Sequence, residues 1–101
     1  MRVNFARLAK FPSIILFGRP QCGLCEEAKE AVMKAKKSLP EIEYKTIDIL
    51  QPDNKSWFDK YAYDVPVIHF QATENSPIKK IMHHIHEQDV INLVESSIES
   101  K

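Results

Sequence analysis

The sequence has few of the features that mark disulfide-rich, membrane-spanning or nucleic-acid-binding proteins. It contains only two cysteines, and its 14 basic residues balance 14 acidic ones. Two cysteines cannot build the disulfide framework of a small secreted domain. A formal net charge of zero removes the overall attraction that nucleic acid or an anionic membrane would need. We therefore expect no nucleic acid and no membrane among the partners.

Long apolar runs are also missing. The longest strongly apolar run covers residues 14–17, far short of a membrane span or of the apolar region of a secretory signal. The first 25 residues contain no acid, a bias typical of a mitochondrial targeting segment and equally of a short basic terminus. Their basic residues are Arg2, Arg7, Lys10 and Arg19. We expect an intracellular protein, cytoplasmic or mitochondrial, that is not secreted.

The length limits the organisation to one domain. A chain of 101 residues buries a single core, and 44% of its residues are hydrophobic. We expect a short basic segment over residues 1–12, a single domain over residues 13–101, and a monomer.

The first half of the chain has the pattern of a βαβ unit. Residues 13–17 (SIILF) form a continuous apolar run, typical of a strand buried on both faces. From Leu24 apolar residues recur at helical spacing, with glutamates early and lysines late, and Pro40 ends this helix. Residues 43–49 (EYKTIDI) form a second strand, and the helix between the two strands makes them parallel.

The second half has the pattern of a short helix, a hairpin and a closing helix. The short helix is expected over residues 52–61, opened by a proline. Three further segments follow: strands over 65–70 and 78–85, joined by a turn at 74–77, and a helix over 89–98. The order βαβαββα predicts an α/β fold in which three helices flank a four-stranded mixed sheet.

Cys22 and Cys25 lie at the predicted turn from the first strand into the first helix. Two thiols at this spacing can close and reopen a small disulfide ring without refolding the chain. The dipole and the unpaired N–H groups at a helix N-terminus favour thiolate over thiol. Cys22 is therefore the expected nucleophile, and Cys25 is the expected resolving thiol. Half of a metal site and an inert pair remain as alternatives.

A metal site would need ligands besides the two cysteines. Zinc takes about four ligands, and without further cysteines the others would have to be histidines. The candidates, at no recognised zinc-finger spacing, are His69, His83, His84 and His86. In the predicted last strand His84 and His86 face one way and His83 the other, which is typical of the polar face of an edge strand. We expect no metal site and no bound cofactor.

Three motifs in chain order carry a family resemblance. They are the Cys-x-x-Cys at the first βα turn, IDI at 47–49, and YAYDVPVIHF at 61–70. With them the chain resembles the glutaredoxin-like branch of the thioredoxin superfamily over residues 13–98. The resemblance implies a thioredoxin/glutaredoxin-like fold, a cis Pro66 lying against the cysteines, and Val65 as the backbone contact of a bound thiol peptide.

The resemblance bears on glutathione in two opposite ways. Arg19 matches the basic residue that glutaredoxins place three positions before the first cysteine to meet a glutathione carboxylate. The glutaredoxin Gly-Gly-acid sequence before the last helix is absent, since the only glycines are Gly18 and Gly23. In that region Asp89 is the candidate helix cap and contact to the glutathione amine. The centre Cys-Gly-Leu-Cys also differs from the Cys-Pro-Tyr-Cys of glutaredoxins.

The sequence thus predicts a glutaredoxin-like thiol-disulfide oxidoreductase that uses Cys22 and Cys25. Its partner would be a disulfide-containing protein or a glutathione mixed disulfide, with glutathione as co-substrate. One alternative is a thioredoxin-fold binding module with little turnover, and another is metal or iron-sulfur binding through the cysteines. The aromatic residues before Val65 are expected to pack the short helix, with Tyr61 or Tyr63 beside the site.

Overall fold

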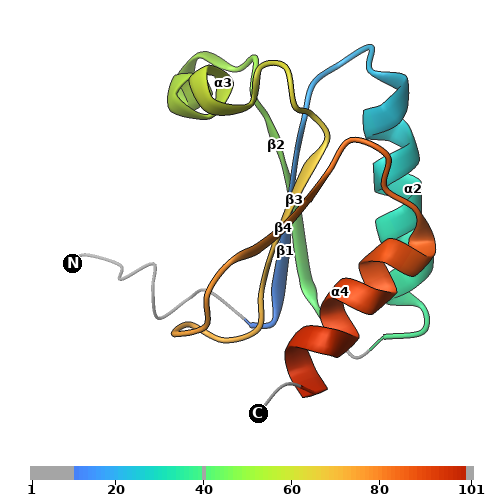
Figure 1. Ribbon diagram of the computed structural model, residues 1–101. Helices are drawn as coiled ribbons and strands as arrows, with labels where there is room; N and C mark the ends of the chain where they lie inside the picture. The colour runs from blue at the N-terminus through green and yellow to red at the C-terminus, as the bar shows by residue number, and fades with distance from the viewer. Residues whose placement is uncertain (1–10, 40, 100–101) are drawn as a thin grey trace.

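The computed structural model describes residues 11–39 and 41–99. The described residues form four strands, three α-helices and one 3-10 turn. In chain order these are β1 (Ser13–Gly18), α2 (Gly23–Lys36), β2 (Glu43–Asp48), η1 (Pro52–Asn54), α3 (Lys55–Tyr61), β3 (Val67–Gln71), β4 (Lys79–Met82) and α4 (Glu87–Glu99) (Figure 1). The predicted order βαβαββα is confirmed.

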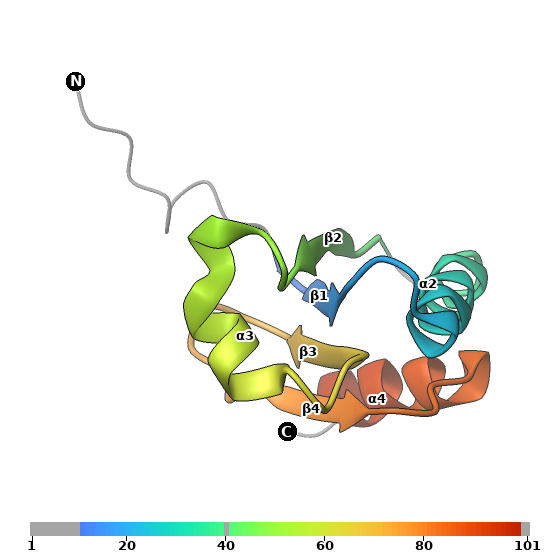
Figure 2. The same cartoon turned by 90° about the horizontal axis from the view of Figure 1, so that it is seen from above.

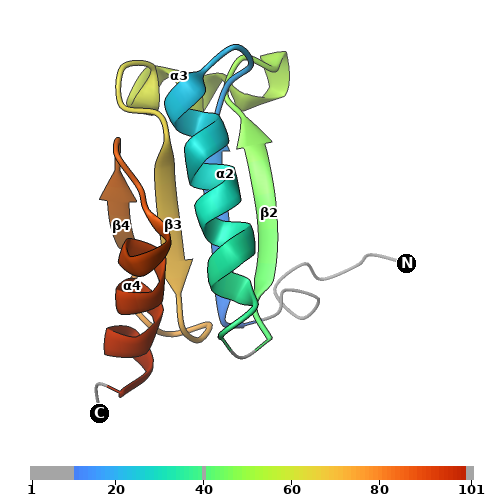
Figure 3. The same ribbon diagram turned by 90° about the vertical axis from the view of Figure 1, so that its right-hand side faces the viewer.

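The sheet has the strand order β2-β1-β3-β4, with β1 and β3 at its centre (Figure 3). β1 and β2 are parallel, as the βαβ pattern predicts, and Gly18 lies opposite Asp48 at their carboxyl ends. β1 and β3 are antiparallel, with Phe17 opposite Val67. β3 and β4 form the antiparallel hairpin. The carboxyl ends of β1 and β2 therefore share an edge of the sheet with the start of β3.

Helices cover both faces of the sheet: α2 and α4 pack on one, and α3 packs on the other (Figure 2). The larger core is apolar and includes Ile14, Leu16, Ala28, Val32, Ile68, Phe70, Val90 and Val94. The smaller core, under α3, is built from Phe17, Ile49, Tyr61 and Val67. Successive residues of a strand point to opposite faces, so β1 supplies both cores, as its continuous apolar run predicts.

The last strand is shorter than predicted. β4 ends at Met82 and not at residue 85, because the backbone of His83 turns into the left-handed region with a φ of 68°. His83, His84 and His86 consequently lie beyond the strand. The prediction that they alternate between the two faces of an edge strand is therefore wrong.

Other boundaries shift by one to three residues. The strand predicted from residue 65 begins at Val67, because Pro66 has no N–H to contribute to the ladder. The short helix is divided into η1 and α3. α2 begins one residue before Leu24 and ends at Lys36, and α4 begins at Glu87, two residues before its predicted start.

The predicted N-terminal segment lies mostly outside the described residues, as do Arg2, Arg7 and Lys10. Within the described ranges, the helices are all too short or too polar to cross a membrane.

Candidate active site

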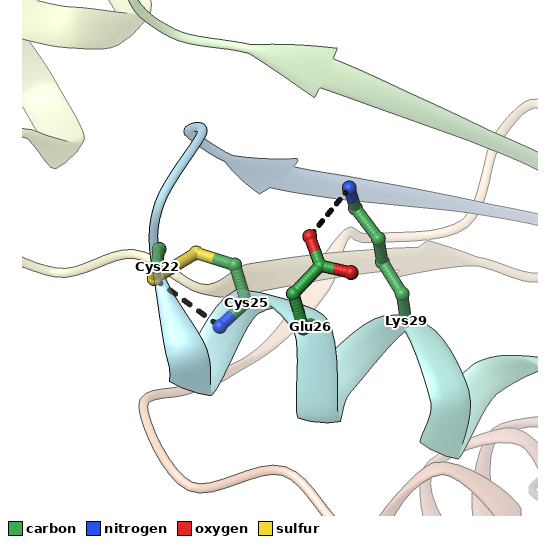
Figure 4. Close-up of a disulfide and its surroundings, with 4 residues drawn as sticks. All are labelled: Cys22, Cys25, Glu26 and Lys29. Carbon is green, nitrogen blue, oxygen red and sulfur yellow. Dashed lines mark hydrogen bonds and ion pairs between the residues drawn. A yellow bond between two sulfur atoms is a disulfide. The ribbon is translucent and has the colours of Figure 1, made fainter.

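The two cysteines form a disulfide at the carboxyl end of β1 (Figure 4). Their Cα atoms are 5.2 Å apart, within the range that disulfides require. Cys22 is the N-cap of α2, in an extended conformation, and its Sγ accepts a hydrogen bond of 3.2 Å from the Cys25 N–H. An N–H group at a helix start also stabilises a negative sulfur. The turn thus places the Cys22 sulfur where a thiolate is favoured.

The two cysteine residues differ in their exposure to solvent. Cys22 is partly exposed, whereas Cys25 is 0% exposed. Gly18 makes this burial possible, because a Cβ atom at Gly18 would lie 3.2 Å from Cys25 Sγ and 3.3 Å from Cys25 Cβ. Cys22 is therefore the more accessible residue of the pair.

Charged side chains of both signs surround a cleft beside the cysteines. The cleft has a volume of about 380 Å³ and lies between β2 and the start of α2, with Arg19, Gln21 and Asp48 in its lining. Glu26, one residue after Cys25, pairs with Lys29 at 3.2 Å (Figure 4). Both side chains of this ion pair are solvent-exposed, so it contributes little to the stability of the turn. Arg19 thus lines a cleft next to the reactive turn.

The sheet brings the Val65-Pro66 segment to the same edge as the cysteines. Because Phe17 pairs with Val67, the residues that follow Phe17 lie beside those that precede Val67. The Val65–Pro66 peptide bond is cis, as the family resemblance implies. Val65 packs its side chain on the core under α3, and Pro66 O accepts a hydrogen bond of 2.8 Å from the His83 N–H. The segment is thus held from both sides.

Asp89 lies apart from Arg19. Its Oδ2 accepts a hydrogen bond of 2.9 Å from the His86 N–H and so caps the start of α4, as predicted. It also lines a groove of about 480 Å³ between β4 and α4, together with Met82 and His84. The structure therefore places Arg19 and Asp89 in separate hollows of the surface.

A buried polar pair under α3 was not predicted from the sequence. His69 is 9% exposed, and its Nε2 lies 2.7 Å from the hydroxyl oxygen of Tyr61. Burial, and to a smaller extent the positive charges of Lys80 and Lys60, lowers the pKa of His69 from 6.5 to about 4. The histidine is therefore neutral near pH 7. The period of two from Val67 to His69 could have placed it on the face of α3, but nothing in the sequence pairs it with Tyr61.

The two tyrosines before Val65 have different surroundings. Tyr61 is buried in the core under α3, as expected for a packing residue. Tyr63 is 97% exposed in the loop that leads to Val65. Of the two, Tyr63 is the aromatic side chain available to a partner on this side of the molecule.

Within residues 11–39 and 41–99, no three histidine, cysteine, aspartate or glutamate side chains are grouped to hold a metal ion. The described histidines do not gather around Cys22 and Cys25.

Comparison with known proteins identifies the family. Residues 13–95 match the family described as glutaredoxin-like domain (DUF836). A 58-residue segment is 41% identical to the glutaredoxin-like protein YDR286C homolog of Dictyostelium discoideum, and the match spans 54% of each chain, about half the length of this curated relative.

Solved structures share the fold at low sequence identity. The X-ray structure of protein XcR50 from X. campestris is 19% identical, with a TM-score of 0.61 over 82% of this chain and 96% of the other. Thioredoxin 1 from Thermosipho africanus is 24% identical, with a TM-score of 0.65 over 86% of this chain and 94% of the other. The fold is thus thioredoxin-like, and the chain belongs to the glutaredoxin-like domain family.

Proposed function

We propose that this protein is a dithiol thiol-disulfide oxidoreductase in which Cys22 attacks and Cys25 resolves. The observation that carries the proposal is the unequal pair at the start of α2. Cys22 is a partly exposed residue whose sulfur accepts a hydrogen bond from an N–H at the helix start, and it is bonded to the fully buried Cys25. An exposed, N–H-stabilised sulfur is suited to attack, and a buried neighbour is suited to intramolecular resolution.

The reaction has two exchange steps. The Cys22 thiolate attacks one sulfur of a substrate disulfide, forms a mixed disulfide and releases the other sulfur as a thiolate. Cys25 then loses its proton and attacks Cys22 Sγ, closing the Cys22–Cys25 disulfide and releasing the second substrate thiol. The substrate gains two electrons and the protein loses two. Two thiols of glutathione, or one external dithiol, restore the reduced pair.

Arg19, Val65 and Pro66 are the proposed substrate contacts. Arg19 supplies a positive charge in the cleft beside the turn, which suits a glutathione carboxylate. Val65 supplies backbone groups beside the cysteines for a bound thiol peptide. Asp89 is not among these contacts, because it lines a different groove and its Oδ2 already accepts a hydrogen bond from the His86 N–H.

Turnover of a glutathione mixed disulfide tests the proposal. The reduced protein, Cys22→Ser and Cys25→Ser are compared with glutathione as reductant and a glutathionylated peptide as substrate. We expect activity from the wild type and none above background from Cys22→Ser. A Cys22→Ser variant as active as the wild type would overturn the assigned nucleophile.

The Cys25→Ser variant separates the two possible resolving thiols. If glutathione attacks the mixed disulfide on Cys22, this variant keeps its turnover of glutathionylated peptide. If only Cys25 resolves, the variant stops after one step, and mass spectrometry detects the adduct on Cys22. The first result supports glutathione as the resolving thiol, and the second assigns that step to Cys25.

A second candidate is a binding module that docks to one protein and turns over small disulfides poorly. The almost complete exposure of Tyr63 favours it, because a large aromatic side chain in the loop that leads to Val65 is suited to contact a protein surface. Comparing glutathionylated peptide with glutathione disulfide distinguishes the two candidates. Efficient turnover of the small disulfide, unaffected by Tyr63→Ser, would reject the binding module.

A further inference from the structure

His83 has an unusual backbone and lies beside the proposed substrate segment. Among residues 11–39 and 41–99, only Gln21 and His83 have a positive φ without being glycine, at 56° and 68°. Gln21 immediately precedes Cys22, and His83 contacts Pro66. A left-handed residue with a side chain costs about 1–2 kcal/mol. Such residues concentrate where function requires them, although histidine tolerates this region better than most.

His83 contacts the residues on both sides of Val65. Its N–H donates to Pro66 O at 2.8 Å. Its imidazole Nε2 lies 3.5 Å from Asp64 Oδ1, with both side chains about half-exposed. His83, the first residue after β4, therefore contacts both Asp64, which precedes Val65, and Pro66, which follows it.

The rest of the segment is fixed from within the fold. The Asp64 N–H donates to Tyr61 O at 2.9 Å, and the Val65 side chain packs on the core under α3. The His83 contacts complete this arrangement from the end of β4. Because Val65 supplies its backbone to the substrate in the proposed function, its orientation matters for binding.

We propose that the His83 imidazole is a positioning group, which holds Asp64 and thereby orients the Val65 backbone for a disulfide substrate. This inference rests on the proposed function of the cysteine pair. The His83 side chain itself contacts neither the sulfurs nor the substrate. Its role is to fix the segment of Val65, whose backbone is the proposed contact of the substrate.

The fold itself does not need an imidazole at this position. Glycine adopts a φ of 68° without strain and keeps the N–H that donates to Pro66. The His83→Gly variant thus removes the contact with Asp64, keeps the backbone hydrogen bond to Pro66 and relieves the backbone. A purely structural role predicts at most a change in stability, whereas a positioning role predicts weaker substrate binding in a protein that is equally or more stable.

Steady-state kinetics with a peptide disulfide test the inference, using wild type, His83→Gly, Asp64→Ala and the double variant. We expect KM to rise about threefold to fivefold in each single variant, the effect of losing one exposed contact between two polar side chains. We expect kcat to stay near wild type, because the sulfurs are untouched. The KM of the double variant should be no higher than the higher KM of the two single variants, since each single variant already removes the same contact. Thermal unfolding should show His83→Gly at or above the wild-type midpoint.

His84→Gly is the matched control, because it removes the next histidine of the same loop and lies outside the pair. It should leave KM unchanged. Three results would overturn the positioning role: an unchanged KM in His83→Gly, an equal rise of KM in His84→Gly, or additive effects on KM in the double variant. If the wild type still turns over the substrate, the proposed function stands in each of these cases. Absence of turnover in the wild type would overturn the proposed function, and this inference with it.

Discussion

The two faces of the sheet differ in size and in chemistry. The face under α2 and α4 is a wide apolar core, whereas the face under α3 is a small aromatic core that includes the hydrogen-bonded pair of Tyr61 and His69. The cysteines start α2, on the large core, and Val65 packs on the small one. The reactive sulfurs and the proposed substrate segment are thus supported by different halves of the molecule.

This division teaches that stability and recognition can be perturbed separately. Apolar burial dominates folding free energy, so the large core should set the stability of the whole domain. The small core packs against Val65, and the lowered pKa of its His69 predicts that acid destabilises this core. Three predictions about the free energy of unfolding test whether the two cores contribute differently, and the one with the largest change comes first.

Truncation in the large core should have the largest effect. Leu16→Ala removes a fully buried side chain between α2 and the sheet, and should lower the free energy of unfolding by about 2–5 kcal/mol. Urea unfolding followed by circular dichroism measures the loss. The matched change on the other side, Trp57→Ala, removes a partly buried side chain and should cost less. An equal or larger loss for Trp57→Ala would contradict the division.

Acid should destabilise the molecule through the small core. The folded-state pKa of His69, about 4, lies below its ordinary value of 6.5, so the unfolded chain binds the proton first. The stabilisation is complete above pH 6.5 and is lost as the pH falls toward 4, by about 2–3 kcal/mol for this residue. Unfolding of wild type and His69→Phe at pH 7.5 and 4.5 measures it. Equal pH dependence in the two proteins would show that His69 is not responsible.

A change at Gly18 should have a smaller effect on stability. A Cβ atom would press on Cys25 Sγ and Cβ at 3.2 and 3.3 Å, so Gly18→Ala should cost about 1–2 kcal/mol. The same change at Gly23 meets nothing within 4 Å and serves as the control. Thermal unfolding of both variants, oxidised, makes the comparison. A midpoint for Gly18→Ala at or above that of Gly23→Ala would show that the close approach is not required.

The sequence predicted the parts of the molecule that follow local periodicity. The continuous apolar run at residues 13–17 and the helical spacing from Leu24 sufficed for the βαβ unit and for the cysteine turn. The hairpin was predicted, but not the end of β4, because a histidine in the left-handed region has no pattern that distinguishes it from a strand histidine.

Contacts between distant residues were beyond the sequence. The hydrogen bond between Tyr61 and His69 depends on the packing of α3 on β3. The contact of His83 with Asp64 depends on how the chain turns after β4. In neither pair are the two residues separated by a number of positions from which a contact could be inferred, as it can between successive turns of one helix. The family resemblance assigned both Arg19 and Asp89 to glutathione binding. Only the structure shows that the two residues line different hollows of the surface.

The central claim is that Cys22 is the attacking sulfur and Cys25 the protected one. Brief treatment of the reduced protein with limiting iodoacetamide at neutral pH, followed by peptide mass spectrometry, tests it most directly. We expect the label to enter Cys22 first, and Cys25 to stay unmodified until the protein is unfolded. Label on Cys25 first, or on both sulfurs at the same rate, would contradict the account.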